Sequence, residues 1–193
     1  MKRSLLALVM LAALPLTAQA AQPNYNYLEA DYVSINIQDV DDMDNAEGFG
    51  LRGSWAMTDS FYLFGSYLSG STEISEVDVD VDQSQLGVGF RHGVTETTDF
   101  IAELSWLNQS IDVEGLGEED GNGGRLSAGF RHSFDPKFDG FVKANYTDGN
   151  DFDGDFSGTV GAFVKFNETW GITAEAEVGG DADIYTLGVR ASF

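Results

Sequence analysis

The feature that most constrains the fold is a recurring segment of about ten residues in which apolar and polar side chains alternate. In one such segment Leu86, Val88 and Phe90 alternate with polar residues and glycines. A period of two places the apolar side chains on one face of a β-strand. Each segment is long enough to cross a bilayer as a tilted strand, which takes roughly 9–11 residues. Ten segments show the pattern: residues 25–37, 48–57, 61–70, 83–92, 99–111, 123–133, 138–147, 156–167, 170–179 and 184–193.

The connections between these segments alternate in length. Short ones at 58–60, 93–98, 134–137 and 168–169 alternate with longer ones at 38–47, 71–82, 112–122, 148–155 and 180–183, which carry 21 of the 32 acids. Short periplasmic turns and longer outer loops are typical of outer-membrane barrels. A soluble sandwich also alternates, but it has no reason to gather its acids at one end. The sequence therefore predicts an all-β fold, a closed antiparallel up-and-down transmembrane barrel with ten strands favoured over eight.

The N-terminus has the three parts of a secretory signal peptide. Lys2 and Arg3 precede an apolar run over residues 5–16, and Ala18 and Ala20 form a small-x-small cleavage site. The run is too short to span a bilayer as a helix, which disfavours a retained anchor. We therefore expect a signal peptide over residues 1–20 and an outer-membrane barrel domain over residues 21–193.

Composition narrows the partners. Removing two bases with the signal leaves 8 bases and 32 acids, a formal charge of 8 − 32 = −24. Such a surface repels nucleic acid. There is no cysteine, so an exported fold must be held by something other than disulfides, and barrel closure in lipid would serve. The expected partners are outer-membrane lipid and, during insertion, the barrel assembly machinery.

Charged residues on the polar faces predict a charged lumen. The expected network consists of Arg52, Arg91, Arg131, Lys165 and Arg190, with Glu29, Asp31, Glu103, Glu175 and Glu177. Bases and acids fall on neighbouring antiparallel strands, so we expect cross-strand pairs, with Lys143 pairing to Asp139. Small barrels have interiors that side chains can fill. A packed lumen is therefore favoured, and a charged pore is the alternative.

Two aromatic patterns fit a membrane location. Aromatic residues that flank the short turns predict an interfacial girdle of Trp55, Phe61, Tyr62, Phe100, Phe138, Phe166 and Trp170. The last segment places one face of apolar residues at the chain end, and this face resembles the signal that the assembly machinery recognises. The expected assembly signal is Tyr185, Leu187, Val189, Ala191 and Phe193.

Catalysis has little support in the sequence. The two histidines, His92 and His132, fall at matching places in two similar segments, which indicates a structural role. No catalytic residue, cofactor site or defined metal site is predicted. The acid-rich stretch 148–155 lacks the EF-hand order and its distal Glu, and the acids of 77–82 alternate along one face of a projecting strand. Both stretches therefore predict diffuse attraction of divalent cations rather than a site.

Several stretches carry a resemblance to a known family. Residues 24–29 (NYNYLE), 77–89 (VDVDVDQSQLGVG) and 164–172 (VKFNETWGI) resemble the Ax twenty-one family of small outer-membrane barrel proteins. The resemblance implies an outer-membrane protein linked to diffusible-signal-factor regulation, vesicles, biofilm and virulence traits, with no catalytic residues to carry over. The function expected is non-enzymatic, structural or surface-interacting. A narrow channel is the first alternative and an outer-membrane enzyme the second.

Overall fold

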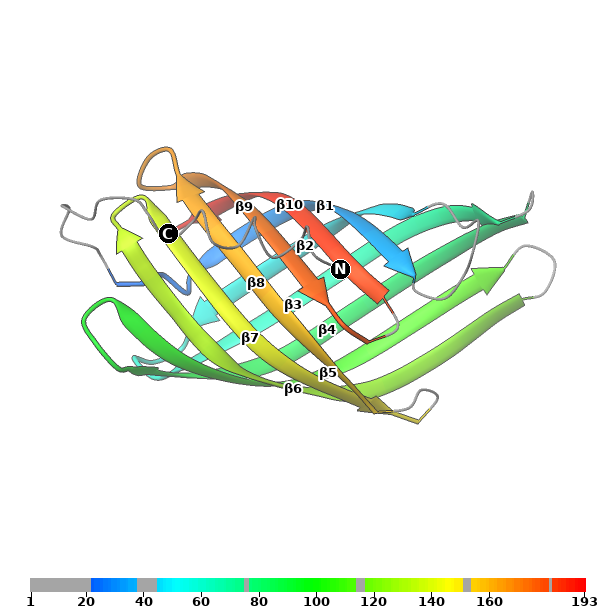
Figure 1. Ribbon diagram of the computed structural model, residues 1–193, viewed down its shortest axis with the longest axis horizontal. Helices are drawn as coiled ribbons and strands as arrows, with labels where there is room; N and C mark the ends of the chain where they lie inside the picture. Colours follow the sequence, from blue (N-terminus) through cyan, green and yellow to red (C-terminus); the bar gives the residue numbers. More distant parts are fainter. Residues whose placement is uncertain (1–21, 38–44, 75–76, 114–116, 151–153, 181) are drawn as a thin grey trace, which may run out of the picture.

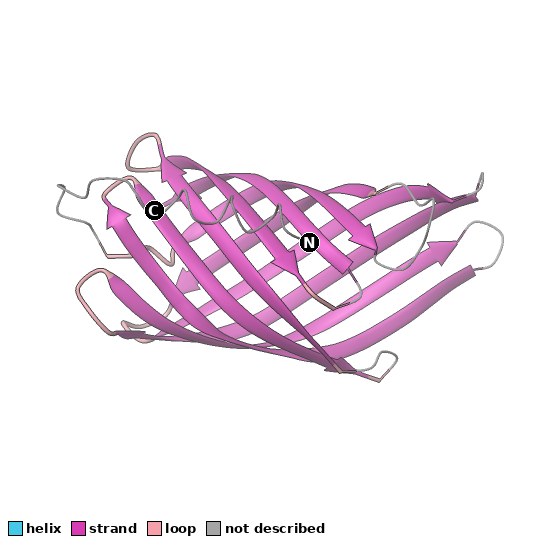
Figure 2. Ribbon diagram, in the orientation of Figure 1, coloured by secondary structure: helices cyan, strands magenta, loops and turns pink. Residues whose placement is uncertain are grey.

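The computed structural model describes residues 22–37, 45–74, 77–113, 117–150, 154–180 and 182–193. These residues form strands and turns (Figures 1 and 2). Within these ranges there is no helix long and apolar enough to cross a membrane. The strands are β1 (Tyr27–Ile37), β2 (Ala46–Ala56), β3 (Phe61–Ile74), β4 (Val77–Gly93), β5 (Thr98–Val113), β6 (Gly117–Asp135), β7 (Phe138–Gly149), β8 (Asp155–Lys165), β9 (Trp170–Val178) and β10 (Ala182–Ser192).

The ten strands close into one barrel. Each strand pairs antiparallel with its neighbours in sequence, and β10 returns to pair with β1 from Tyr27↔Ser192 to Ile37↔Ala182. Closure leaves no strand edge unpaired along the shared height of the wall, as a barrel in lipid requires. The prediction of a ten-stranded up-and-down barrel is confirmed, and the eight-stranded alternative is wrong.

The strands differ in length, and here the predicted boundaries need correction. Strands β3 to β6 have 14, 17, 16 and 19 residues, whereas β9 has 9. Residues 71–82 and 112–122, predicted as loops, lie mostly in these strands, whose tips reach beyond β1 and β10 in Figure 1. The reason is that alternation continues: Val79 is buried while Asp80 is exposed. Acidic residues on the solvent face do not interrupt backbone pairing.

The outer surface is apolar and the interior is polar. Phe49 is 73% exposed and Leu86 is 70% exposed, whereas Asp139 is 1% exposed. A water-soluble protein keeps its charged residues outside. The reversed arrangement needs a surrounding of acyl chains, which is how transmembrane barrels are solvated.

Candidate functional site

The lumen gathers buried charge from most of the strands. Seven bases and seven acids project into it: Arg52, Arg91, Arg125, Arg131, Lys143, Lys165 and Arg190, with Glu29, Asp31, Asp99, Glu103, Asp139, Glu175 and Glu177. The alternation of each strand brings them inside, because their neighbours in sequence face the lipid.

Glu29 on β1 lies at the centre of the most buried cluster. Register places it directly opposite Arg52 on β2 and Arg190 on β10, and both guanidinium groups form ion pairs with its carboxylate. Asp31, two residues along the same face, accepts a hydrogen bond from Arg52 Nε at 2.8 Å. Arg190 also lies over the Tyr27 ring at 3.9 Å. Each of these charges therefore has an opposite charge beside it, as burial demands.

Three further ion pairs join strands that are not neighbours. Arg52 Nη1 donates to Glu175 Oε2 on β9 at 2.8 Å, and Arg125 Nη2 on β6 donates to Glu177 Oε1 on β9 at 2.6 Å. Each of these two pairs joins strands three positions apart in the sheet order, so the bonds cross the lumen.

Glu103 on β5 holds the third of these pairs. Lys143 Nζ on β7 donates to Glu103 Oε2 at 3.1 Å, and Tyr62 OH on β3 donates to Glu103 Oε1 at 2.7 Å. The Glu103 carboxylate therefore links β5 to β3 and to β7, each of which lies two positions away in the sheet order. The expected pairing of Lys143 with Asp139 is wrong, because the lysine reaches across the barrel rather than along its own strand.

Asp139 on β7 instead pairs with two bases near the end of the barrel that carries the short turns. Its Oδ2 lies 3.4 Å from both Arg131 Nη2 and Lys165 Nζ, and Ser133 Oγ donates to its Oδ1. Arg131 on β6 and Lys165 on β8 flank β7, so this is a pairing between neighbouring strands.

Tyr25, just before β1, is buried inside the barrel near the same end. Its hydroxyl donates to Asp99 Oδ2 at 3.0 Å, and its ring lies 4.8 Å from the Tyr62 ring. The guanidinium groups of Arg91 and Arg131 lie 4.6 Å and 5.0 Å from the Tyr25 ring centre. Burial raises the pKa of Tyr25, so the phenol stays protonated and can donate.

Hydrogen bonds to the chain end and to β2 hold the segment that carries Tyr25. Asn26 O accepts a hydrogen bond from Phe193 N at 3.2 Å, and Asn26 Oδ1 accepts one from Ala56 N at 2.8 Å. Asn24 Nδ2 donates to Phe193 O at 3.4 Å. Residues 24–26 are therefore attached to the chain end and to β2, which holds Tyr25 in the barrel mouth.

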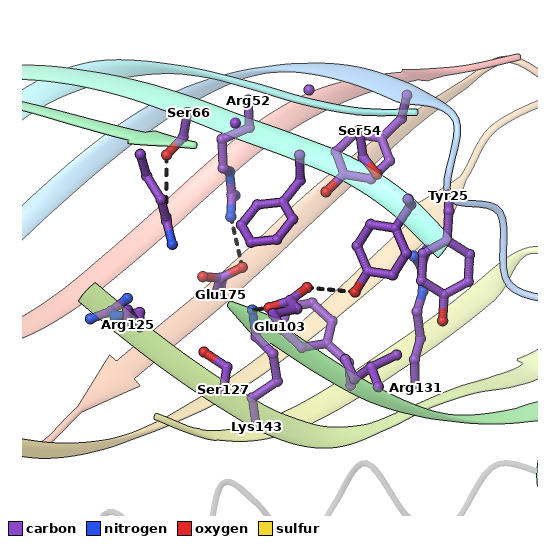
Figure 3. Close-up of a pocket in the computed structure, with 18 of the residues that line it drawn as sticks. Tyr25, Arg52, Ser54, Ser66, Glu103, Arg125, Ser127, Arg131, Lys143 and Glu175 are labelled. Carbon is purple, nitrogen blue, oxygen red and sulfur yellow. Dashed lines mark hydrogen bonds and ion pairs between the residues drawn. The ribbon is translucent and has the colours of Figure 1, made fainter. Parts of the chain in front are cut away.

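Above Tyr25 the lumen encloses a cavity of about 120 Å³. Figure 3 shows Arg52, Glu103, Lys143 and Glu175 pointing into this space. Arg125 also lines it, near the far end from Tyr25. The cavity is polar and can hold several water molecules.

Arg91 differs in its contacts from the other residues predicted to form the lumen network. Among the described residues Arg91 forms no ion pair, and its Nε has no hydrogen-bond partner. The predicted lumen network did not include Arg125 and Asp99. Both share the face of inward charges on the same strands, Arg131 and Glu103, so alternation could have identified them. Tyr25 precedes the regular strand, so no periodicity could have revealed its role.

Most of the predicted girdle faces outward. Trp55 is 66% exposed and Phe166 is 59% exposed, while Phe100 stacks edge-on against Phe130 at 5.6 Å. Tyr62 is the exception and the girdle prediction for it is wrong. Phe61 begins β3 facing out, so Tyr62 must face in, where it is 3% exposed. The predicted girdle residues that face outward are therefore Trp55, Phe61, Phe100, Phe138, Phe166 and Trp170.

The two predicted histidines lie near the short-turn ends of β4 and β6. His92 is exposed, and the His132 Nδ1 atom lies 2.8 Å from Thr98 Oγ1. In the described ranges no group of three or more histidines and carboxylates is placed to hold a metal ion. Residues 151–153 of the acidic stretch lie outside the described residues.

The outward face of β10 carries Tyr185, Leu187, Val189 and Ala191, and Phe193 follows the strand with 69% of its surface exposed.

A closed barrel with an apolar outer band and a charged interior defines a transmembrane β-barrel. Residues 4–188 match the family described as outer membrane protein beta-barrel domain, so the chain belongs to this family. The protein is therefore an outer-membrane β-barrel protein, and the predicted location is confirmed.

Solved structures show the same fold at low sequence identity. The NanC porin is 8% identical with a TM-score of 0.54, over 86% of this chain and 100% of the porin. The KdgM porin in complex with disordered oligogalacturonate is 14% identical with a TM-score of 0.52, over 86% and 99%. The translocator domain of autotransporter NalP from Neisseria meningitidis is 10% identical with a TM-score of 0.51, over 89% of each chain. No curated protein sequence matches significantly.

Proposed function

We propose that the protein is a non-enzymatic barrel with a closed lumen, which acts structurally or by surface interaction through its acidic outer connections. The observation that carries the proposal is that ion pairs cross the lumen. These are Arg52–Glu175 and Arg125–Glu177, and Tyr25 is buried near one end. Such a barrel would hold its shape in the membrane and present its outer connections to the surroundings.

A narrow channel is the second candidate. Two of the similar structures are porins. The lumen also holds a polar cavity of about 120 Å³ between Tyr25 and the outer mouth of the barrel. Conduction would require the crossing ion pairs to part and Tyr25 to leave its place between Arg91 and Arg131. Charged side chains lining such a path would set its ion selectivity.

The resemblance to the Ax twenty-one family supplies a biological setting for the first candidate. It implies a role in vesicles, biofilm or virulence traits rather than a reaction. The divalent cations expected at the acidic connections would then modulate surface contacts without a defined site. An enzyme is disfavoured, because His92 and His132 fall at matching places near the short-turn ends of β4 and β6, which favours a structural role.

Planar bilayers test the closed lumen. We expect the purified protein to give no steady unitary conductance. The informative variant is Arg125→Gln, which removes a lumenal base, and its matched control is Lys137→Gln in an exposed turn. Steady conductance in the parent, with selectivity altered by Arg125→Gln and not by Lys137→Gln, would establish the channel instead.

A further inference from the structure

The outer wall carries a short row of residues unlike the rest of the apolar band. Trp106 on β5 pairs in register with Gly124 on β6, and Gly124 pairs with Asp148 on β7. All three belong to the outward-facing set of their strands, and Trp106 is 58% exposed. An aromatic ring and a carboxylate therefore flank a position with no side chain.

A second row of three amides lies directly above. Asn108 pairs in register with Asn122, and Asn150 Nδ2 donates to Asn122 Oδ1 at 3.1 Å. The backbone continues this contact, because Asn150 N donates to Asn122 O at 3.0 Å. Side-chain amides offer both donors and acceptors without net charge.

The two rows form a groove of about 230 Å³ lined by Trp106 and residues 122–124 and 148–150. The glycine keeps its floor open. A Cβ added to Gly124 would meet only Ser105 O, at 3.8 Å. Any larger side chain at this position would project into the groove.

The groove lies at the edge of the apolar band. The row below it is Leu104, Leu126 and Tyr146, which are 60%, 57% and 37% exposed. On the same outward face β5 continues upward from Trp106 to Asn108, which is polar. Interfacial tryptophan marks the level of lipid headgroups. The groove therefore opens at headgroup height, with acyl chains beneath it.

We propose that this groove binds the sugar ring of a neutral glycolipid in the outer leaflet. The C–H face of a pyranose packs on the exposed face of Trp106, and its hydroxyls bond to Asp148 and to the amides of Asn122 and Asn150. The carboxylate disfavours a phosphate headgroup. The apolar row at Leu126 receives the acyl chains of the same molecule, which is why we commit to a lipid rather than a soluble sugar.

The test uses vesicles of phosphatidylcholine with increasing digalactosyldiacylglycerol. Trp55→Phe and Trp170→Phe leave Trp106 as the sole tryptophan, because the chain has three. We expect a saturable change in its emission as the glycolipid fraction rises. Gly124→Val should weaken the apparent affinity at least tenfold. The matched control is Gly158→Val, an outward glycine whose added Cβ meets nothing within 4 Å.

The outcomes separate the sources. Free digalactose acting as well as the glycolipid at equal concentration would show a soluble-sugar site and overturn the lipid assignment. An equal response to phosphatidylglycerol, or an unchanged affinity in Gly124→Val, would show that Trp106 is an ordinary interfacial aromatic. If the double tryptophan variant does not fold, native mass spectrometry of the otherwise unaltered chain decides. We expect a retained glycolipid adduct that Gly124→Val loses and Gly158→Val keeps, and equal adducts in all three would refute the proposal.

Discussion

Replacing Glu29 by glutamine tests whether the lumen is a packed ion-pair network. The Glu29 side chain is 0% exposed and forms ion pairs with Arg52 and Arg190. After the change Arg52 keeps Asp31, 2.8 Å from its Nε. Arg190 keeps no described carboxylate partner, only the rings of Tyr27 at 3.9 Å and Phe163 at 4.8 Å. The variant therefore leaves one guanidinium group buried without an opposite charge.

The expected cost follows from that burial. Removing one partner of a buried pair costs about 3–5 kcal/mol. The glutamine amide still accepts a hydrogen bond, so Glu29→Gln should lie near the lower value and Glu29→Ala near the upper one. About 3 kcal/mol corresponds to a more than hundredfold change in the unfolding equilibrium constant, since each 1.4 kcal/mol is roughly tenfold. A hydrated lumen predicts only about 0–1 kcal/mol, as for exposed pairs.

Equilibrium unfolding by guanidinium in lipid vesicles measures the difference. Tryptophan emission follows the transition, and the heat-modifiable gel mobility of the barrel checks that the folded form is the same. Glu96→Gln is the matched control, because Glu96 is an exposed acid in the turn between β4 and β5. If Glu29→Gln unfolds within 1 kcal/mol of this control, the lumenal charges are solvated and the packed network is refuted.

The remaining predictions concern the lumen base, the chain end and export. Arg131→Ala should cost about 3–5 kcal/mol because it breaks a buried pair. Arg91→Ala should cost about 1–2 kcal/mol, since only its contact with an aromatic ring is lost, and equal losses in the two unfolding curves would contradict this order. Glu103→Gln should destabilise more mildly, by about 1–3 kcal/mol in the same assay. Deleting Phe193 should reduce outer-membrane insertion in fractionated cells, and unchanged levels would show that the terminal pattern is incidental. N-terminal sequencing of the outer-membrane form should begin at Ala21; a retained residue 1–20 segment would contradict the signal peptide.

The sequence predicts the architecture well, because alternation and turn spacing are local properties. Phe61 and Trp170 mark strand starts that the structure places at those residues. The outer strand ends were less predictable. Strand β4 begins at Val77, six residues before the start predicted from the apolar pattern, although the alternating acids of residues 77–82 already indicated a projecting strand. Charge alone does not distinguish a loop from a strand that projects into water.

The sequence predicted which strand face each lumen charge lies on, but not which residue it pairs with. Alternation shows that Glu175 points inward, yet it gives neither the height of a residue in the barrel nor its distance across the lumen. Closure brings Glu175 to Arg52, three strands away in the sheet order. Tyr25 lies beyond the reach of any periodic pattern, because its position depends on hydrogen bonds of Asn26 to β2 and to Phe193.

The division of charge between the lumen and the rest of the chain connects these findings. Residues 21–193 contain eight bases, and all of them except Lys137, exposed in a turn, lie in the lumen. Among the described residues, seven carboxylates accompany seven bases there, so this lumen network is formally neutral (7 − 7 = 0), and the other ionisable residues of 21–193 sum to 1 − 25 = −24. Buried charge is stable only when it is paired, whereas solvated charge can accumulate. Many charge-selective pores are lined by rings of side chains of one sign. The balance inside therefore favours packing, and the excess outside favours interactions at the surface.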